Sequence, residues 1–391
     1  MKFSCTLVVC GFFLIPSLRA VYAPVPDQEQ GNDLTFSFRT EVLYDTNIFG
    51  AATNEVESTV WQFAPRVSYK ASVSAQTFVS AAYGLTLDYF DRRPGEKTLD
   101  SHNLSARLTH TFSSRTNFDL NEVFVIAKNP ESLLAGLPLN TDQSYHRNQL
   151  DGRFTTALSP KLGTTFKART VYYHYRNAAL GRDIDRVENL YGLSGDYAFL
   201  PEAKAVAEYR HQDVFYRKEG ELKNKKSDYL MGGLDFDVAK KVSLSGRLGY
   251  EWRHRESERS TTAPFAEASG KFVYLTGSFL SGGYAYTLEE TSDTDRFTDT
   301  KVHRLFINVQ HRITALIFVS AALTYEPSEL QGRRGQPNID EDTTRLGAGL
   351  SYLPTKNWLV GLNLDYDQID SEDASRDLKR ARVGLNARYS F

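Results

Sequence analysis

Arginine recurs at alternate positions of short segments whose other positions are apolar. In residues 379–391, Arg380, Arg382 and Arg388 alternate with alanine, valine, leucine and tyrosine. A guanidinium group carries a permanent positive charge and binds carboxylate and phosphate oxygens. If several such faces converge on one space, they favour the binding or passage of anions there. The ten arginines for which we predict this position are Arg39, Arg66, Arg107, Arg153, Arg169, Arg210, Arg247, Arg304, Arg345 and Arg382.

Two other patterns could support catalysis or metal binding, and neither has the spacing that the chemistry needs. Ser194 follows Gly192, but Gly195 comes one residue too early for the strained turn that exposes a nucleophilic serine. The eight histidines are scattered, and the acidic clusters near residues 293, 340 and 372 lack the spacing of a calcium-binding loop. We therefore predict no enzymatic activity, no cofactor and no metal site.

The segments that carry the arginines are typical of amphipathic β-strands. Leu34, Phe36 and Phe38 alternate with polar residues, and this period of two recurs in 18 segments. One face of such a strand suits lipid and the other suits water. We predict an all-β fold, a transmembrane up-and-down antiparallel β-barrel of about 18 strands. Because residues 116–127 and 265–290 depart from the pattern, 16 strands is the alternative, and Gly282-Gly283 is either a turn or a bulge.

The connections between these segments alternate between short turns and longer, more charged loops. The connections near Pro160 and Pro354 span a few residues, whereas those at 46–58 and 327–341 are several times longer. Short periplasmic turns and long extracellular loops are characteristic of outer-membrane barrels. This alternation predicts that both termini lie on the periplasmic side.

The final segment has the features of a strand that closes a barrel. Its apolar face ends on an aromatic residue at the C-terminus, where a membrane interface would lie. The residues for which we predict this role are Val383, Leu385, Tyr389 and Phe391.

The N-terminus has the pattern of a secretory signal peptide. Lys2 precedes the mostly apolar residues 3–18, and small residues follow at Ala20 and Ala23. We predict a signal peptide over 1–23, with cleavage after residue 20 or 23, a short periplasmic segment over 24–32, and the barrel over 33–391. Both cysteines, Cys5 and Cys10, lie in the signal, so the mature chain has no disulfide. The predicted location is the bacterial outer membrane, with multiple passes, after Sec-type export.

The composition excludes several classes of protein. Outside the N-terminus no run of about 18 apolar residues occurs, which excludes a helical membrane protein. Mean hydropathy is −0.42, a value that a barrel with one polar face can have. Loss of Lys2 and Arg19 with the signal changes the formal charge from −2 to −4, which argues against a nucleic-acid partner.

The loop at 128–143 contains an unusual apolar stretch that includes Leu133, Leu134 and Leu137. An extracellular loop gains nothing from such side chains unless they pack against something. The hypothesis is that this loop folds into the barrel and narrows the pore. The alternative is packing against the rim, a neighbouring loop or an adjacent subunit, so a homo-oligomer is one of the options.

The first predicted hairpin carries Tyr44-Asp45-Thr46-Asn47-Ile48-Phe49, and a strand with Phe63-Ala64-Pro65 follows. In this it resembles an outer-membrane β-barrel porin family whose members open with a Tyr-Asp-x-Asn-Ile-Phe turn and a proline-containing strand. The motif covers about residues 40–90, and the strand rhythm is similar over the mature chain. The resemblance implies an outer-membrane barrel, and no catalytic residues come with it. Such barrels are also similar to ones associated with exopolysaccharide systems.

From these features we predict a porin-like channel for passive diffusion of small hydrophilic solutes, with a lean towards anions. In the alternative interpretation, the arginines have a structural role, and their pairs with acids stabilise the inner wall. Two other functions stay open: a conduit in exopolysaccharide export, and a non-conducting structural or adhesive barrel. The predicted partners are outer-membrane lipid and lipopolysaccharide, the barrel-assembly machinery during insertion, and the solutes themselves.

Overall fold

The computed structural model describes residues 32–127, 144–218, 223–238, 241–256, 260–291, 293 and 295–391. The predicted signal peptide and most of the segment over 24–32 lie outside the described residues. The loop at 128–143, with Leu133, Leu134 and Leu137, also lies outside them.

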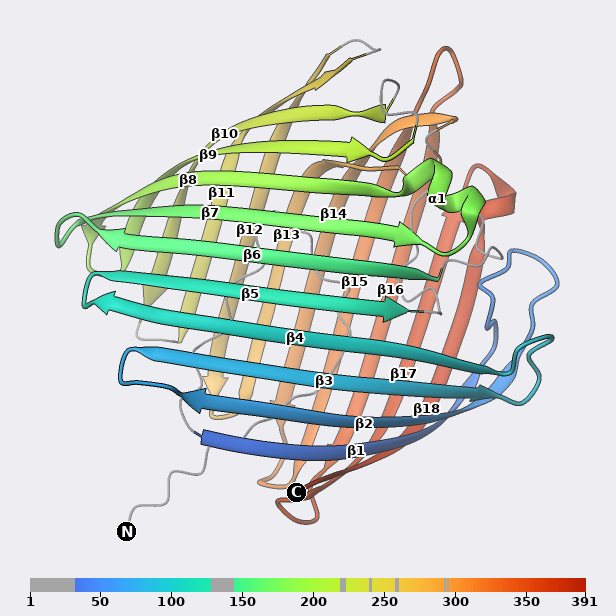
Figure 1. The fold of residues 1–391 in the computed structure, drawn as a ribbon. Coiled ribbons are helices and arrows are strands. Elements are labelled where there is room, and N and C mark those ends of the chain that lie inside the picture. The colour runs from blue at the N-terminus through green and yellow to red at the C-terminus, as the bar shows by residue number, and fades with distance from the viewer. Residues whose placement is uncertain are drawn as a thin grey trace.

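Within the described residues, the chain forms one antiparallel sheet of 18 strands that closes on itself (Figure 1). Each strand pairs with its neighbours in sequence, and β1 also pairs with β18. The prediction of an 18-stranded all-β barrel is confirmed, and the alternative of 16 strands is wrong. The strands are β1 (Asn32–Asp45), β2 (Ser58–Ser72), β3 (Thr77–Phe90), β4 (Thr98–Ser113), β5 (Thr116–Ala127), β6 (Tyr145–Ala157), β7 (Leu162–Tyr175), β8 (Arg186–Leu200), β9 (Ala203–Tyr216), β10 (Lys225–Val238), β11 (Val242–Arg255), β12 (Thr261–Leu275), β13 (Ser278–Glu289), β14 (Phe297–Arg312), β15 (Ile317–Gly332), β16 (Ile339–Tyr352), β17 (Trp358–Ser371) and β18 (Leu378–Ser390).

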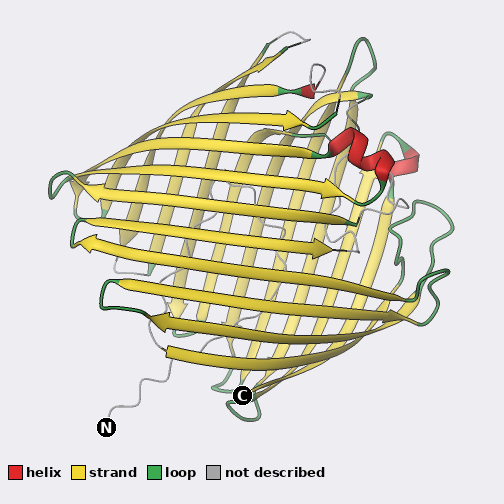
Figure 2. Cartoon of the chain, in the orientation of Figure 1, coloured by secondary structure: helices red, strands yellow, loops and turns green. Residues whose placement is uncertain are grey.

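The two ends of the barrel differ in their connections. One end carries tight turns, such as Thr276–Gly277 between β12 and β13, together with the first residue of β1 and the C-terminus. The other end carries the longer loops, with the helix α1 (Ala178–Ile184) and the short 3-10 helix η1 (Ala374–Arg376) (Figure 2). Short turns face the periplasm in outer-membrane barrels, so we name these the periplasmic and the extracellular end.

Side chains alternate between the outer surface and the interior along every strand, as the pleat requires. Leu34, Phe36 and Phe38 of β1 are exposed on the outer face, and Arg39 and Glu41 point to the interior. Closure leaves every strand with two hydrogen-bonded neighbours, which a backbone in lipid needs. No helix in the described ranges is both long and apolar enough to cross a membrane.

The last strand, β18, pairs with β1 and closes the barrel. The backbone N–H of Phe391 donates to the carbonyl of Phe36 at 2.8 Å. The ring of Tyr389 packs between Trp358, at 4.9 Å, and Phe391, at 4.7 Å. Val383 and Leu385 are exposed on the outer face of β18. The aromatic group therefore belongs to the periplasmic edge of the lipid-facing surface.

The doubtful region at 265–290 contains two full strands, and the boundary between them differs from the expected one. The turn lies at Thr276–Gly277, where Gly277 has φ +80°, and Gly282-Gly283 lies inside β13 as regular strand. Gly283 is needed because a Cβ there would come within 2.6 Å of the Phe306 ring. The two glycines thus make room for the neighbouring strand, and they do not form a turn or a bulge.

Candidate functional site: the charged interior of the barrel

The Tyr-Asp-x-Asn-Ile-Phe segment joins the first strand to the last at the extracellular end. Asp45 is 1% exposed and accepts hydrogen bonds from Arg380 on β18, at 2.5 and 3.1 Å. The backbone N–H of Thr46 donates to the carbonyl of Ala381, and the N–H of Ala381 donates to Oγ1 of Thr46. These contacts tie the turn to the strand that closes the barrel.

Asn47 holds the turn in shape from the inside. Its side chain is 0% exposed, accepts from the N–H of Ala51 at 2.9 Å, and donates to the carbonyls of Ala51 and Lys379. Ile48 follows and packs in a buried apolar cluster with Val60, Phe90 and Leu99. The motif therefore turns inwards and caps the interior between β1 and β4.

The ten arginines chosen from the sequence all lie on the inward-facing positions of their strands. At least seven of them contact carboxylates directly. These contacts are Arg39–Glu41 at 2.6 Å, Arg107–Asp119 at 2.5 Å, Arg169–Asp151, Arg210–Glu208 at 2.8 Å, Arg247–Asp235 at 2.8 Å, Arg304–Glu326 at 2.5 Å and Arg382–Asp367 at 3.1 Å. Arg345 lies in the electrostatic field of Asp367 and Glu326. Much of the interior positive charge is therefore paired with acids, as the structural interpretation of these arginines predicts.

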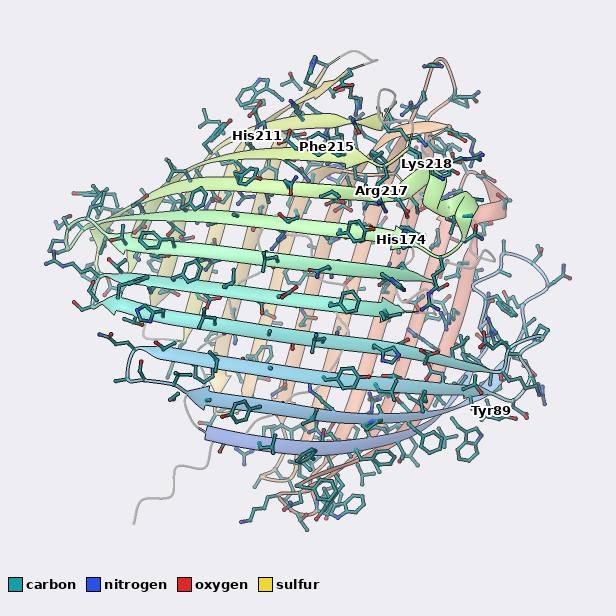
Figure 3. The ribbon with its side chains drawn as sticks, in the orientation of Figure 1. Tyr89, His174, His211, Phe215, Arg217 and Lys218 are labelled. Carbon is teal, nitrogen blue, oxygen red and sulfur yellow. The ribbon has the colours of Figure 1, made fainter. Side chains whose placement is uncertain are left out.

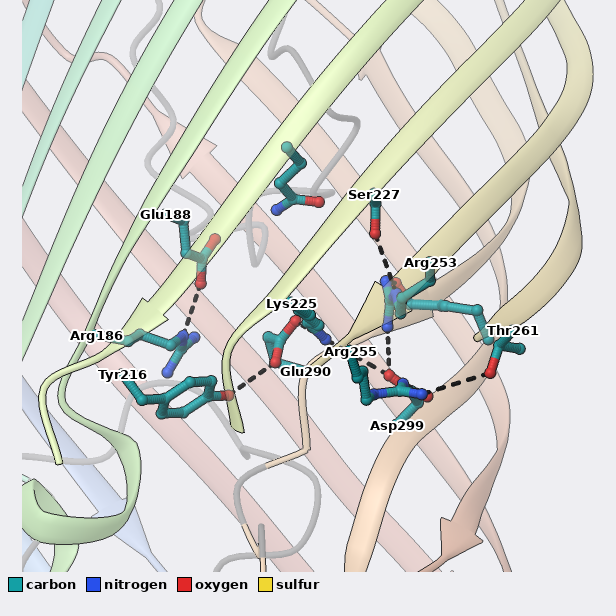
Figure 4. Close-up of polar contacts among 12 residues, drawn as sticks. Arg186, Glu188, Tyr216, Lys225, Ser227, Arg253, Arg255, Thr261, Glu290 and Asp299 are labelled. Carbon is teal, nitrogen blue, oxygen red and sulfur yellow. Dashed lines mark hydrogen bonds and ion pairs between the residues drawn. The ribbon is translucent and has the colours of Figure 1, made fainter. Parts of the chain in front are cut away.

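One large group of interior charges is deeply buried (Figure 4). We call it the corner network, and it lies at the extracellular ends of β8 to β14. Its members are Arg186, Glu188, Tyr216, Lys225, Arg253, Arg255, Glu290 and Asp299. The Arg253 side chain, 2% exposed, donates to Asp299, to Glu251 at 2.8 Å and to the carbonyl of Leu288 at 2.9 Å. Nearly every polar atom of Arg253 is thus satisfied without water.

The corner network joins strands that are not neighbours in the sheet. Arg253 and Arg255 of β11 both contact Asp299 of β14, and Lys225 of β10 contacts Glu290 just after β13. The Tyr216 hydroxyl of β9 donates to Glu290 at 2.7 Å. Strands three apart lie about 14 Å apart along a sheet. The sheet must therefore curve tightly here, and the side chains fill the angle inside it.

Glu290 lies beyond the end of β13 and stays ionised although it is buried. Burial alone raises the pKa of its carboxyl, but the charges of Lys225, Arg253 and Arg186 outweigh this effect and lower the pKa to about 2. Glu290 consequently remains charged across the physiological pH range.

The opposite wall, from β16 through β18 to β2, is more open. The side chains of Arg39 and Arg382 on this wall are 29% and 33% exposed, although both have carboxylate partners. Asp365 lies on the same wall near Arg382, and Asn363 donates to Glu41 at 3.1 Å. Arg39 and Arg382 are therefore accessible to water and solutes inside the barrel.

Comparison with protein families identifies the family of the chain. Residues 34–391 match the family described as "Putative beta-barrel porin 2". The chain belongs to this family. No curated protein matches it. The match to the porin family thus extends from β1 to the end of β18.

Among solved structures, the porin-family barrel is similar to the outer-membrane protein OpdK of Pseudomonas aeruginosa, with 11% identity and a TM-score of 0.49. The match covers 92% of this chain and 99% of OpdK. It is also similar to OccAB4 of Acinetobacter baumannii, with 10% identity, coverage of 94% and 100%, and a TM-score of 0.49. The siderophore receptor PirA of P. aeruginosa matches at 9% identity, with coverage of 93% and 81% and a TM-score of 0.45.

The helix α1 was missed by the strand-based reading of the porin-family chain. Asn177 caps it by accepting from the N–H groups of Ala179 and Leu180. Leu180 and Ile184 then pack on the inward face of β7, against Tyr173 and Tyr175. The sequence predicts one of the longer, charged loops over 177–185 and no helix there, although the spacing of Leu180 and Ile184 is that of a helical turn.

The eight histidines lie on the outer face of the porin barrel, away from the charged interior. Three of them accept or donate a hydrogen bond with a tyrosine hydroxyl: His102 with Tyr83, His303 with Tyr284, and His311 with Tyr274, at 2.8 to 3.0 Å. Among the described residues, no cluster of three or more potential ligands could hold a metal ion. Ser194 points to the interior, where its hydroxyl lies 3.5 Å from the carbonyl of Thr165.

Proposed function

We propose that the barrel is a channel for passive diffusion of small hydrophilic solutes across the bacterial outer membrane. The observation that carries this proposal is the chemistry of the interior. A closed barrel whose inner face is lined by ionised, hydrogen-bonded side chains suits water and polar solutes, whereas the apolar side chains face outwards. Membership in a porin family supports the same function.

The solute path follows the open wall of β16, β17, β18, β1 and β2. The corner network fills the angle on the other side at the extracellular end, and its arginines are almost wholly covered. Arg39 and Arg382 retain exposed guanidinium surface, which can attract a passing anion. The remaining arginines predicted from the sequence then serve mainly to hold the wall together.

Selectivity for anions is weak in this proposal because acids neutralise most of the positive charge. Glu41 and Asp367 are paired with Arg39 and Arg382 on the open wall itself. One unit charge at 5 Å in water contributes about 0.8 kcal/mol, which corresponds to a two- to fourfold change in permeability. Neutralising one wall charge should therefore change the anion-to-cation ratio by about that factor.

Single-channel recording in a planar bilayer tests the proposal. The purified barrel should give stable conductance steps, and Arg382→Gln should lower the anion-to-cation permeability ratio two- to fourfold. Arg247→Gln removes the same charge from a less exposed position on β11, so it serves as the matched control. A barrel that runs as folded on an unheated gel but never conducts would refute diffusion and favour export or a structural role.

A further inference from the structure

The outer face of the barrel carries a compact group of cationic and aromatic side chains at the extracellular ends of β6, β7 and β9. We call it the outer basic patch. Figure 3 labels His174 near the end of β7, and Arg217 and Lys218 just beyond the end of β9, on the same side of the barrel. Its members are His146, Tyr172, His174, Arg176, Arg217 and Lys218.

Direct contacts connect the members of the outer basic patch. Nε of Arg176 lies 3.3 Å from Nε2 of His146, and the rings of His146 and His174 are 5.9 Å apart. The Tyr172 ring stacks with His174 at 6.5 Å, and its hydroxyl accepts from Arg217 at 2.9 Å. The Arg217 guanidinium also lies 5.7 Å from the centre of the Tyr172 ring. Two arginines are thus positioned at opposite ends of one row of rings.

The arginines of the outer basic patch have no carboxylate partner among the described residues, unlike most interior arginines. The nearest acid in the row is Asp185, which is occupied by accepting from Nδ1 of His174 and from the backbone N–H of Tyr175. Further along the outer face, His211 contacts both Asp213 and Asp228, so the net charge there is negative. Two arginines without a carboxylate partner in the described part of the chain, Arg176 and Arg217, thus lie at the ends of β7 and β9.

The outer basic patch lies at the extracellular edge of the lipid-facing surface. On β6 and β7, further towards the periplasmic end, Leu150 and Phe166 are exposed and apolar. Arg176 and Arg217 each follow the last residue of a strand directly. Side chains at this level meet the headgroups of the outer leaflet, where aromatic and basic residues are favoured.

We propose that the outer basic patch binds a phosphate group of a phosphorylated glycolipid in the outer leaflet. Arg176 and Arg217 supply forked donors for phosphate oxygens. Tyr172 holds Arg217 in place in advance, which reduces the entropy lost on binding. The imidazoles of His146 and His174 lie between the two arginines and hold the row of rings together.

The opposite outer rim explains why such binding is confined to one side. At the extracellular ends of β14 to β17, a depression is lined by Glu329, Asp342 and Asp370 together with Lys301. Lys301 is held by Glu329 at 2.9 Å, so this rim is acidic overall and repels phosphate. Removing Lys301 therefore changes the charge at a comparable height without touching the proposed site.

Native mass spectrometry of the detergent-solubilised full barrel tests the proposal, with lipid A that carries two phosphates as the probe. The double variant Arg176→Gln/Arg217→Gln should weaken binding at least tenfold, and Lys301→Gln should leave it unchanged. Dephosphorylated lipid A should bind to the wild-type barrel as weakly as phosphorylated lipid A binds to the double variant. An unheated gel confirms that each variant is folded, and Arg176→Lys/Arg217→Lys should restore part of the affinity.

Two outcomes would overturn the proposal. Equal binding of phosphorylated and dephosphorylated lipid A would show that acyl chains alone determine the affinity. Inorganic phosphate that binds as tightly as the lipid would assign the patch to a soluble anion. Conductance is recorded separately, so failure of the lipid site and failure of the channel can be told apart.

Discussion

The pair formed by Asp45 and Arg380 gives the sharpest test of how the barrel closes. Asp45 is almost completely buried, and the Arg380 side chain is 12% exposed. Removing one partner of such a pair leaves an uncompensated charge, which costs about 3–5 kcal/mol. We therefore expect Asp45→Ala to lower the free energy of unfolding by about this amount. Asp45 also accepts from the N–H of Asn47 at 3.0 Å, so the turn itself loses a support.

Urea unfolding of the barrel in lipid vesicles, followed by mobility on an unheated gel, measures the effect. The double variant Asp45→Leu/Arg380→Leu should recover most of the loss because replacement of both charges leaves nothing unpaired. Arg296→Gln is the control: its exposed pairs with Asp293, at 2.6 Å, and with Asp373, at 3.1 Å, should each be worth less than about 1 kcal/mol. The reasoning fails if Asp45→Ala costs no more than Arg296→Gln, or if the double variant is as unstable as Asp45→Ala.

Three further outcomes follow from the interior. Asp367→Asn frees Arg382 on the open wall, so the anion-to-cation permeability ratio should rise about two- to fourfold, and a fall in reversal-potential measurements would contradict the proposed path. The pKa of Glu290 is lowered in the folded state, so its contribution to stability is complete above about pH 4.5 and decreases as the pH falls towards 2. Urea midpoints of wild type and Glu290→Gln should accordingly converge in that window, and parallel curves would refute the assignment. Ile48→Ala empties a buried position in the inward turn and should cost about 2–5 kcal/mol in the same unfolding assay, whereas no loss would show that the turn does not pack.

Most of the fold follows from local alternation. A period of two fixes which side chains of β1 face lipid, and one closed sheet satisfies all the strands at once. The inward position of Arg39 and Arg382 was therefore predictable. The boundary between β12 and β13 was not, because Gly282-Gly283 has the composition of a turn and its actual role, space for Phe306, depends on the neighbouring strand.

The corner network could not be predicted from the sequence for a related reason. Its contacts join Arg253 to Asp299 and Lys225 to Glu290, pairs that are separated by three or more strands in the closed sheet. Alternation shows which residues point inwards, but it contains no information on how tightly the sheet bends. The degree to which an interior arginine is covered depends on that bend.

The turn that follows β1 has a consequence for the order in which the barrel is assembled. Asp45 and Arg380 are 335 positions apart in the chain, and Asn47 reaches the carbonyl of Lys379 over a similar separation. The first hairpin can form early, with contacts of Asp45 and Asn47 inside the turn, but Arg380 and the carbonyl of Lys379 are absent until the eighteenth strand arrives. In a chain that lacks β18, the Asp45 carboxylate would lie at an unpaired edge of the sheet without Arg380. The hydrogen bonds and the ion pair of the motif at the start of the barrel are therefore complete only when the last strand is in place.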